Sequence, residues 1–303
     1  MSPPSELVSK EPRPSHLCRS WLFVEGANQD ALSTAPGSGA DVLIQELEDF
    51  TPPSERPKAR ALAVETYAAW RAAGAVVAVR VNPLSRDGMD DLAAVMKGAP
   101  DIVALPKVHG HQYVMELDEA VTRFEREYGL PEGSTRLLPN VESAKGLMTL
   151  PAIAGASPRV VGCLIASEDL AADLGAERGM DGAELDYARA RFLVECRAAE
   201  VVAVDCPFTF RDDDGAAAET LWARRRGYTA KSAVHHAHAR IINDILTPSD
   251  EAVAQARIVK ERFEEARARG EARVEVDGAL VELPNYLNAC RLITRHRDLT
   301  SVT

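Results

Sequence analysis

The sequence predicts a (β/α)8 barrel, or TIM barrel, and three observations support this fold class. Eight short apolar runs rich in Val, Ile or Leu recur along the chain. Helix-like stretches of roughly a dozen or more residues separate most of these runs. Nearly every run ends in a charged or ionisable residue. Charge at the ends of apolar strands is costly unless it faces a shared, solvated and functional mouth, which is where such barrels carry their reacting groups.

The eight predicted strands follow one another along the chain. They cover 20–26, 40–49, 75–82, 101–108, 135–142, 160–169, 201–208 and 228–235. Their ends supply Glu25, Glu48 with Asp49, Arg80, Lys107, Glu142, Glu168 with Asp169, Asp205 and His235. Amphipathic, alanine-rich helices are expected between the strands, as over 56–74 and 112–129, with glycine and proline marking helix ends.

Three regions are predicted from composition and spacing. Residues 1–18 are polar and proline-rich and predict a flexible arm, the barrel is expected over 19–247, and an extension covers 248–303. Within the extension we expect a long charged helix, a hairpin with Asp277 and Gly278 at its turn, and a last helix. Because the extension is too small to make its own core, it is expected to pack on the barrel or on a neighbouring subunit.

Composition excludes several classes of function. The net charge of -11 argues against nucleic acid as a partner. Charges and prolines interrupt the longest apolar stretches, so no membrane span is predicted. The N-terminus lacks the pattern of a secretory signal. The five cysteines are scattered without a C-x-x-C pair, which is typical of reduced thiols and predicts a cytoplasmic protein.

Two acidic residues at the ends of neighbouring runs form a candidate metal site. Glu142 ends the fifth run and Asp169 ends the sixth, and neighbouring strands lie roughly 5 Å apart. Two carboxylates that leave positions for water and substrate oxygens are the usual arrangement for Mg2+. Glu168 is the alternative ligand, because neighbouring residues of a strand point to opposite sides. Alternatively, each carboxylate caps the following helix or pairs with a nearby base.

Two cationic residues are expected near this site. Arg80 could bind a carboxylate bidentately and neutralise charge that develops on an enolate. Alternatively it forms a salt bridge with Glu48 and Asp49, and the two roles are compatible because acids behind an arginine fix its orientation. For Lys107, an ion pair or a substrate contact is preferred over a Schiff-base role.

Five histidines lie in two short motifs, HGHQ and HHAH. The His-x-His spacing is common by chance and both motifs begin predicted helices, so surface or helix-capping positions are expected. These histidines are His109, His111, His235, His236 and His238. Among them, His235 is the best candidate for proton transfer because it ends the eighth run.

Several segments together resemble the HpcH/HpaI aldolase/citrate lyase beta-subunit family, and most closely its citrate lyase beta-like branch, which includes malyl-CoA and citramalyl-CoA lyases. The segments are RSWLFVEG, LED at 47–49, VRVN, LPKV, LLPNVESAKG, SEDLAADLG, FRDDDG, GYTAKSAVHHAHARIINDILTPS and the hairpin VDGALVELP. SEDLAADLG combined with VESAKG is specific. The resemblance covers nearly all of residues 19–290.

The resemblance implies a metal-dependent TIM barrel that makes or breaks a carbon–carbon bond next to a carbonyl. It implies Mg2+, or alternatively Mn2+, held by Glu142 and Asp169, and Arg80 as the residue that holds the substrate's carboxylate or oxo group. It also implies Glu282 as a proton-transfer acid on the hairpin, which in the family often reaches a neighbour's active site in a trimer. The expected assembly is a homotrimer or hexamer. Glu48 and Asp49 are further expected to act in catalysis, and Arg19, Lys107 and Glu142 to contact substrate.

The sequence departs from the family pattern at four places. Where the family's first strand continues P-G-N, this chain has Glu25-Gly26-Ala27-Asn28-Gln29-Asp30-Ala31, and no Arg or Lys remains in this stretch to meet coenzyme A phosphates. Its I-H-P-x-Q is Val-His-His-Ala-His at 234–238, its hairpin Asp is Glu282, and its D-L-E-D is Glu46-Leu47-Glu48-Asp49. The chemistry is therefore expected to be retained, while the substrate class stays open.

The predicted function is a Mg2+-dependent lyase or aldolase that acts on a 2-oxo or 2-hydroxy carboxylate through an enolate. A thioester of the (citra)malyl-CoA or citryl-CoA type is preferred over a free acid. Two alternatives are a thioester hydrolase on the same metal site and a subunit that needs partner chains.

Overall fold

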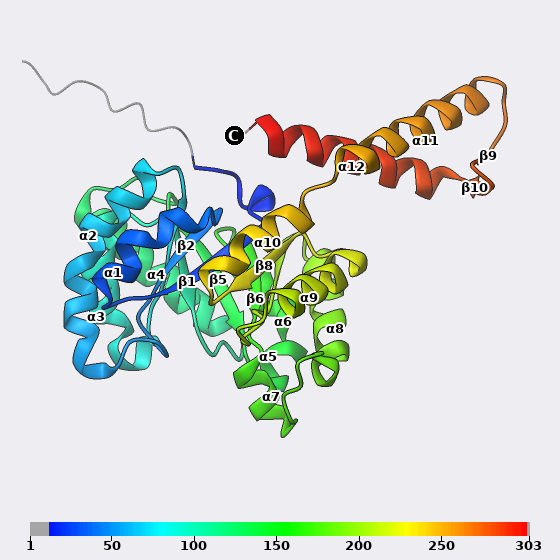
Figure 1. Ribbon diagram of the computed structural model, residues 1–303. Coiled ribbons are helices and arrows are strands. Elements are labelled where there is room, and N and C mark those ends of the chain that lie inside the picture. Colours follow the sequence, from blue (N-terminus) through cyan, green and yellow to red (C-terminus); the bar gives the residue numbers. More distant parts are fainter. Residues whose placement is uncertain (1–11, 302–303) are drawn as a thin grey trace, which may run out of the picture. The chain divides into compact units, whose positions relative to one another are not determined.

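The computed structural model describes residues 12–301, and most of them belong to a closed barrel of eight parallel strands in the order β1 to β8. Figure 1 shows these strands enclosed by helices. The strands are β1 Ser20–Glu25, β2 Val42–Glu46, β3 Val76–Arg80, β4 Ile102–Leu105, β5 Arg136–Val141, β6 Gly162–Ile165, β7 Val202–Asp205 and β8 Ala230–Ala233. Pairing of β1 with both β2 and β8 closes the ring. The predicted (β/α)8 barrel is confirmed.

Helices connect successive strands around the outside of the barrel. They are α1 Gln29–Thr34, α2 Arg56–Ala72, α3 Met89–Val95, α4 His111–Tyr128, α5 Ala144–Met148, α6 Leu150–Ala154, α7 Glu168–Leu174, α8 Asp186–Ala198, α9 Asp213–Arg226 and α10 His236–Leu246. In α2 the buried residues are Ala59, Ala63, Tyr67 and Trp70, and this spacing of three and four residues forms one apolar stripe toward the barrel. No helix between residues 12 and 301 is long and apolar enough to cross a membrane.

The predicted flexible arm lies partly outside the described residues, which begin at Pro12. Within the described part, Ser15–Leu17 form a short 3-10 helix, and the side chains of Leu17 and Cys18 are buried. Cys18 belongs to the apolar cluster inside the barrel. The end of the predicted arm is therefore packed against the barrel core.

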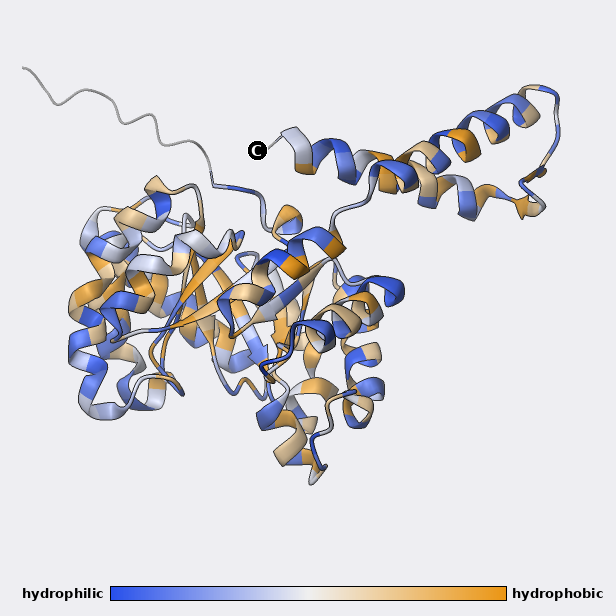
Figure 2. Cartoon of the chain, in the orientation of Figure 1, coloured by the Kyte–Doolittle hydropathy of each residue, from blue (hydrophilic) through white to orange (hydrophobic). Residues whose placement is uncertain are grey.

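The inside of the barrel is filled by alternate residues of each strand, and Figure 2 shows the strands coloured largely as hydrophobic. The interior cluster comprises Cys18, Trp21, Phe23, Val42, Ile44, Val76, Ala78, Ile102, Ala104, Leu138, Leu164, Val204 and Ala230. Because side chains alternate between the two faces of a strand, the same inward rows continue to Glu46 in β2, Arg80 in β3, and Asn140 and Glu142 at the end of β5. Apolar residues thus fill the inside of the barrel, and charged residues continue the same rows at the carboxyl ends of the strands.

Asp205, which was predicted to face the mouth, belongs to the opposite face of β7. It follows the inward residue Val204, and its carboxylate accepts hydrogen bonds from Arg189 of α8 at 2.9 and 2.6 Å and from Lys231 of β8 at 2.9 Å. Glu219 of α9 accepts from the same two cations, each at 3.0 Å. The prediction for Asp205 was wrong, because a position at a strand end does not determine which face the side chain takes.

The C-terminal residues form a second compact unit, and the division between the two units falls between Asn243 and Asp244. The second unit contains α11 Asp250–Ala268, β9 Val274–Val276, β10 Ala279–Val281 and α12 Leu283–Ser301. The predicted hairpin is confirmed: Asp277 and Gly278 have φ of 50° and 76°, the positive values that a tight two-residue turn requires.

The expectation that the extension makes no core of its own was wrong. Phe263, Val276 and Val281 are buried together, and Val259, Val274 and Tyr286 pack against them. This cluster joins α11, the hairpin and α12 into one folded element. Packing of the unit against the barrel or a neighbouring subunit stays a prediction.

Replacing Asp205 with alanine should destabilise the barrel by about 3–5 kcal/mol, because Arg189 and Lys231 would keep buried charges without their shared carboxylate. Urea unfolding followed by circular dichroism measures the loss. Glu132→Ala is the control, because it removes the partner of the exposed Arg126 at 2.9 Å and should leave the unfolding midpoint nearly unchanged. Equal midpoints for the two variants would contradict the stabilising role of Asp205.

Candidate active site

Arg80 ends β3 and lies among four carboxylates at the mouth of the barrel. Its Nε donates to Glu46 at 2.9 Å, and its Nη2 donates to Asp49 at 3.1 Å and lies 3.6 Å from Glu48. Its Nη1 lies 3.8 Å from Oε1 of Glu142 and donates no hydrogen bond to any described residue. Burial disfavours the charged guanidinium, but the four carboxylates outweigh burial and raise its pKa. Arg80 is therefore a fixed cation with one nitrogen available to a ligand.

Glu142 follows β5 and is a buried carboxylate without a hydrogen-bond partner. It is 3% exposed, and neither of its oxygens accepts a hydrogen bond within residues 12–301. Its pKa is raised to about 7, mainly by burial; Arg80 and Lys107 oppose this rise, whereas the charges of Asp169 and Glu48 add to it. An unpaired buried carboxylate is costly, so its retention indicates a ligand.

Asp169 and its neighbour Glu168 lie in the first turn of α7, after β6 has ended at Ile165. Glu168 is exposed, and its carboxylate accepts from Arg178 at 3.2 Å and from Thr209 at 2.8 Å. Asp169 is half-buried, and its carboxylate accepts no hydrogen bond from a side chain of the described residues. The prediction that these two residues alternate along a strand was wrong, since both are helical. Glu168 is already paired, so Asp169 is the available carboxylate beside Glu142.

The residues at the mouth fit a divalent cation. Five carboxylates (Glu46, Glu48, Asp49, Glu142 and Asp169) and two cations (Arg80 and Lys107) give a formal charge of -3 when all are ionised. Within residues 12–301 there is no group of three or more His, Cys, Asp or Glu residues arranged to hold a metal. A metal at the mouth would therefore rely on two carboxylates, water and substrate oxygens, which is the coordination that Mg2+ accepts.

Lys107 lies in the loop after β4 and pairs with the acids that follow β2. Its Nζ binds Glu48 and lies 3.4 Å from Asp49. Burial disfavours the charged amine, but Glu48 and Asp49 outweigh burial and raise its pKa. The backbone φ of Lys107 is 55°, a left-handed conformation that costs a non-glycine residue about 1 kcal/mol. A protonated, ion-paired lysine agrees with the predicted ion pair rather than with Schiff-base chemistry.

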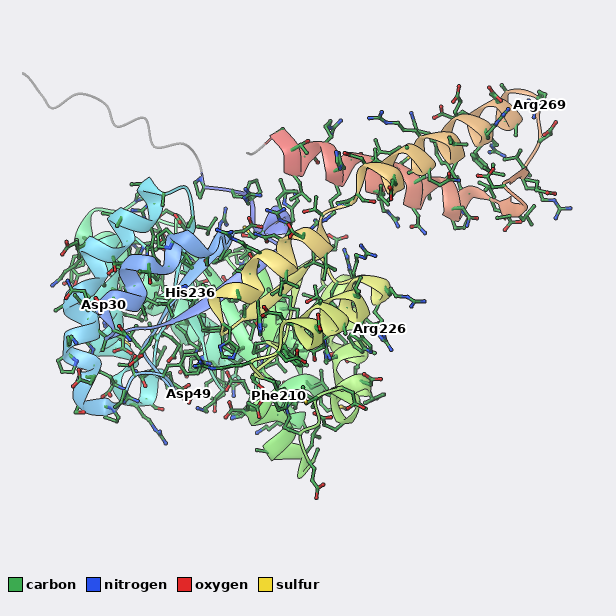
Figure 3. The ribbon with its side chains drawn as sticks, in the orientation of Figure 1. Asp30, Asp49, Phe210, Arg226, His236 and Arg269 are labelled. Carbon is green, nitrogen blue, oxygen red and sulfur yellow. The ribbon has the colours of Figure 1, made fainter. Side chains whose placement is uncertain are left out.

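Glu48 is the second carboxyl group at the mouth with a pKa raised to about 7. Burial is the largest cause and the adjacent Asp49 adds to it, while Lys107 and Arg80 act in the opposite direction. Its Oε2 is buried and accepts no hydrogen bond from a described residue. Glu48 is therefore able to exchange a proton near neutral pH. Figure 3 labels its neighbour Asp49, in the loop after β2, and Phe210, in the loop after β7, both at the carboxyl end of the barrel.

Arg19 is not part of this site, which corrects its predicted role in binding substrate. It precedes β1 at the amino end of the barrel, whereas Arg80 and Glu142 lie at the carboxyl ends of β3 and β5. Its Nε and Nη2 donate to the two oxygens of Asp41 at 2.8 and 2.9 Å, and its backbone N–H donates to Asp41 at 2.7 Å. Arg19 thus joins β1 to β2 at the opposite end.

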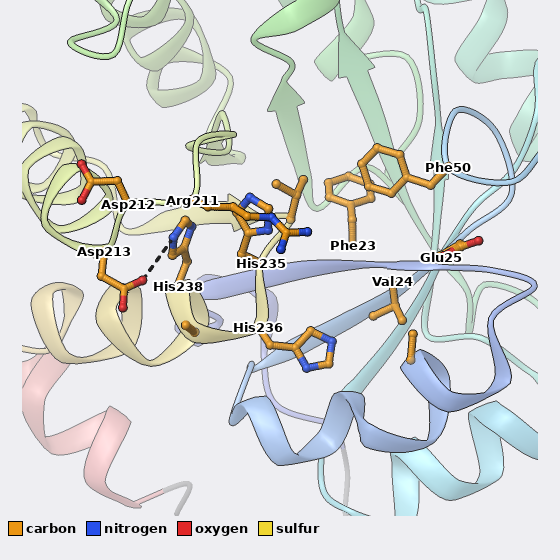
Figure 4. Close-up of a pocket in the computed structure, with 13 residues that line it drawn as sticks. Phe23, Val24, Glu25, Phe50, Arg211, Asp212, Asp213, His235, His236 and His238 are labelled. Carbon is orange, nitrogen blue, oxygen red and sulfur yellow. Dashed lines mark ion pairs between the residues drawn. The ribbon is translucent and has the colours of Figure 1, made fainter.

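A cavity of about 800 Å³ adjoins Arg80 through Phe23, whose ring lies 5.0 Å from the guanidinium carbon. Figure 4 shows its lining, which includes Phe23, Glu25, Phe50, Arg211, Asp212, Asp213, His235, His236 and His238. Arg211 is the one arginine or lysine in this lining, against three acids. The cavity can therefore accommodate a second part of a ligand held at Arg80, next to more negative than positive charge.

The histidines of the second motif line this cavity, but they differ in exposure. His238 is 2% exposed, and its Nε2 lies 3.5 Å from Asp213, so the expectation of a surface position was wrong for it. His235 Nε2 lies 3.1 Å from the carbonyl oxygen of Thr209. In the first motif, His109 contacts the Ser143 hydroxyl at 2.9 Å.

Two inward-facing polar residues were given no predicted role. Glu46 is fully buried and binds Arg80, and Asn140 is fully buried with neither of its side-chain polar atoms hydrogen-bonded to a described residue. The signal for both was their spacing of two residues from inward apolar positions, Ile44 for Glu46 and Leu138 for Asn140.

Fold and site together define a (β/α)8 barrel whose charged residues, at the carboxyl ends of its strands, are suited to hold a divalent cation and an anionic ligand. The chain belongs to the HpcH/HpaI aldolase/citrate lyase family, whose model matches residues 19–236. It is 32% identical to the citrate lyase subunit beta of Leuconostoc mesenteroides subsp. cremoris, over 91% of this chain and 92% of that protein. It is 29% identical to an L-malyl-CoA/beta-methylmalyl-CoA lyase of Rhodobacter capsulatus, over 97% of this chain and 99% of that protein.

Solved structures agree with this assignment. The CitE protein of Mycobacterium tuberculosis, in complex with magnesium, acetoacetate and coenzyme A, has a TM-score of 0.75 and 26% identity, over 92% of this chain and 98% of that chain. A citrate lyase beta subunit of the same organism was solved with oxaloacetate and magnesium. The predicted family and the predicted class of carbon–carbon lyase are confirmed, and magnesium, the predicted cofactor, occurs in these neighbours.

Glu142→Gln should make the metal-free protein more stable at pH 8, by about 1–3 kcal/mol. The pKa of Glu142 is raised from 4.5 to about 7 on folding, so the wild type loses stability as pH rises through this range. Well below pH 4.5 the carboxyl group is neutral in both states, and the two proteins should be equally stable. Unfolding midpoints measured with a chelator at about pH 3.5 and at about pH 8 check this.

Saturating Mg2+ should raise the unfolding midpoint of the wild type at pH 8, because an ion that binds only the folded protein stabilises it. The midpoint of Glu142→Gln should not change, because this variant lacks the carboxylate that would bind the ion. The same midpoint measurement with and without Mg2+ tests this. An equal rise in both proteins would exclude Glu142 as a ligand.

Proposed function

We propose that this chain is a magnesium-dependent carbon–carbon lyase acting on a 2-hydroxy or 2-oxo carboxylate that carries a thioester, of the (citra)malyl-CoA or citryl-CoA type. The observation that carries the proposal is the buried, unpaired carboxylate of Glu142 beside Asp169 and the available Nη1 of Arg80. A carboxylate pair and a guanidinium placed together can hold both oxygens of a 2-hydroxy or 2-oxo acid.

Each residue then has a defined role in the proposed reaction. Glu142 and Asp169 would hold Mg2+, which when bound supplies positive charge for the oxygen that becomes negative as the carbon–carbon bond breaks. Arg80 donates from Nη1 to the substrate's carboxylate or oxo oxygen, while Glu46 and Asp49 hold the other guanidinium nitrogens. These fixed donors favour the developing enolate over the ground state.

Proton transfer is assigned to acids at the mouth and on the hairpin. The hydroxyl proton of a 2-hydroxy acid must leave as the bond breaks, and the thioester enolate must gain a proton to become the product. Glu48, with its pKa raised to about 7, is suited to exchange a proton near neutral pH. Lys107 holds Glu48 in place, and Glu282 of the hairpin is the second candidate acid.

A coenzyme A thioester is supported by the malyl-CoA lyase relative and by the coenzyme A in the Mycobacterium tuberculosis CitE structure. The charge of the neighbouring cavity favours a free acid instead, because its lining holds Arg211 as the one arginine or lysine against Glu25, Asp212 and Asp213. A second candidate function is thioester hydrolysis, because a (3S)-malyl-CoA thioesterase of Cereibacter sphaeroides is 30% identical over 93% of this chain and 95% of that protein.

The assembly and location follow the same proposal. We infer a homotrimer or hexamer in the cytoplasm, able to act without partner chains. Relatives named as a subunit of citrate lyase make a need for partner chains the alternative. Gel filtration of the purified chain followed by an activity measurement separates the two.

The proposed function is tested by product analysis with Mg2+ and malyl-CoA, citramalyl-CoA or the corresponding free acids. A lyase releases an oxo acid, measured as its phenylhydrazone, in equal amount to acetyl-CoA and without free thiol. A hydrolase releases free coenzyme A, measured with a thiol reagent, and no oxo acid. Turnover of free acids alone would overturn the thioester assignment, and no turnover by the purified chain would favour the partner-dependent subunit.

Asp169→Asn should lower kcat/KM at least about 100-fold, because it removes one of two protein ligands of the cation. Glu168→Gln is the matched control in the same helical turn and should stay within about threefold, since its carboxylate is paired with Arg178 and Thr209. Steady-state kinetics at saturating Mg2+ checks both variants. The reverse order of effects would assign the ligand to Glu168.

Glu282→Gln should lower kcat if this exposed residue transfers the proton. If the hairpin serves a neighbour's site, mixing Glu282→Gln with Asp169→Asn subunits should restore about a quarter of wild-type activity in a randomly mixed trimer, because one site in four then has both residues. If the hairpin serves its own barrel, co-expressed variants should remain inactive.

A further inference from the structure

Glu46, the last residue of β2, is enclosed by the loop that follows it. Its Oε1 accepts the backbone N–H groups of Glu48 at 2.6 Å and Asp49 at 3.2 Å, and its Oε2 accepts that of Phe50 at 2.5 Å. Its own carbonyl oxygen accepts from the Thr51 hydroxyl at 2.6 Å. Successive N–H groups that converge on one anion fix the path of a loop.

The same carboxylate also holds Arg80. Oε1 accepts from Nε of Arg80 at 2.9 Å, and the other acids that contact the guanidinium, Glu48 and Asp49, lie on the enclosed loop. One side chain therefore fixes the arginine directly and also fixes two of its remaining partners. The fourth carboxylate, Glu142, comes from a different strand and lies on the Nη1 side.

We propose that Glu46 is a positioning residue of the active site, which orients Arg80 so that Nη1 faces the substrate beside Glu142. Because Glu46 is fully buried and binds Arg80, it acts through Arg80. The inference rests on the proposed function, because it assigns to Nη1 the oxygen of the carboxylate or oxo group. The inference adds to the proposed site a buried residue that contacts Arg80.

The charge and the length of Glu46 both matter for this role. The carboxylate receives four N–H donors, three from the loop and one from Arg80, and it offers only acceptors. A glutamine of the same shape would present N–H groups to at least one of these donors, leaving buried donors unpaired. An aspartate keeps the charge but is one methylene shorter, so it would reach the loop and Arg80 less well.

The test is a double-mutant cycle of Glu46→Gln with Arg80→Lys, because lysine lacks the guanidinium that Glu46 orients. In the wild-type background Glu46→Gln should lower kcat/KM about 10- to 100-fold, mainly in kcat. In the Arg80→Lys background the same change should cost less than about threefold. Glu46→Asp, which keeps the charge, should recover part of the loss. Equal losses in both backgrounds would overturn the positioning role.

Glu125 of α4 provides a matched control for loss of stability. It is a buried carboxylate that accepts from Gly133 and Thr135 backbone N–H groups, each at 2.9 Å, and from Arg159 at 2.8 Å. Glu125→Gln should lower the unfolding midpoint as Glu46→Gln does, and change kcat/KM less than about twofold. A Glu125→Gln loss as large as that of Glu46→Gln would reduce Glu46 to a general stabilising residue.

The two proposals fail differently in this design. Wild-type turnover tests the function, and the ratio between variants tests Glu46. If wild-type protein turns over no thioester, Mg2+-dependent binding of oxaloacetate measured by calorimetry replaces kcat/KM in the same cycle. If Glu46→Asp and Glu46→Gln both fail to fold while Glu125→Gln folds, Glu46 is required for the barrel itself and the positioning role is overturned. Absence of both turnover and binding in folded wild type would overturn both proposals.

Discussion

The two-residue alternation of side chains along the barrel strands is the constraint on which the site depends. The inward rows of β2, β3 and β5 begin with valine, isoleucine, alanine or leucine and end with Glu46, Arg80 and Glu142. A shift of one residue in any of these strands would turn its inward side chains to the outside of the barrel. The outward rows show the other outcome, since Asp205 and Lys231 of β7 and β8 are bound to each other and to the helices that cover them. One rule therefore separates the reacting charges from the stabilising ones.

The two sets of charges differ in how completely they are balanced. Outside the barrel, Arg189 and Lys231 meet Asp205 and Glu219, so cations and acids are equal in number. At the mouth the acids exceed the cations, and Glu142 carries the cost as a pKa raised to about 7. A fold selected for stability alone would replace that carboxylate with an apolar side chain. Because the excess is local and surrounds the free nitrogen of Arg80, it is better explained by a ligand that supplies positive charge.

The sequence predicted the barrel well because apolar runs of this length and spacing allow few other arrangements. It also located Arg80, Glu142 and Asp169, which the structure brings to one mouth. It failed where the position of a side chain depends on which face of a strand it takes or on a partner far away in the sequence. Asp205 ends β7, but the alternation of side chains directs it to α8; Arg19 precedes β1 at the amino end of the barrel, where it binds Asp41. No role was predicted for Glu46, because Glu48 and Asp49 in the following loop are also acidic, and only the contacts show which acid accepts the loop N–H groups and Arg80.

Recognition of the carboxylate and recognition of the rest of the substrate are separable in this barrel. Glu46 and Arg80 end strands whose positions are fixed by the closed sheet, so the carboxylate-binding arginine changes little when surface loops change. The adjoining cavity is lined by the end of β1, by loops and by the start of α10, where His238 lies 3.5 Å from Asp213. Arg211 is the one arginine or lysine in that lining, so a nucleotide phosphate in the cavity would meet a lining with more negative than positive charge. A thioester carrier bound to this chain must therefore either keep its phosphates away from the cavity or meet positive charge from residues beyond its lining. The enolate chemistry depends on neither condition, which explains how one barrel of this type can serve substrates that share a carboxylate and differ in the group attached to it.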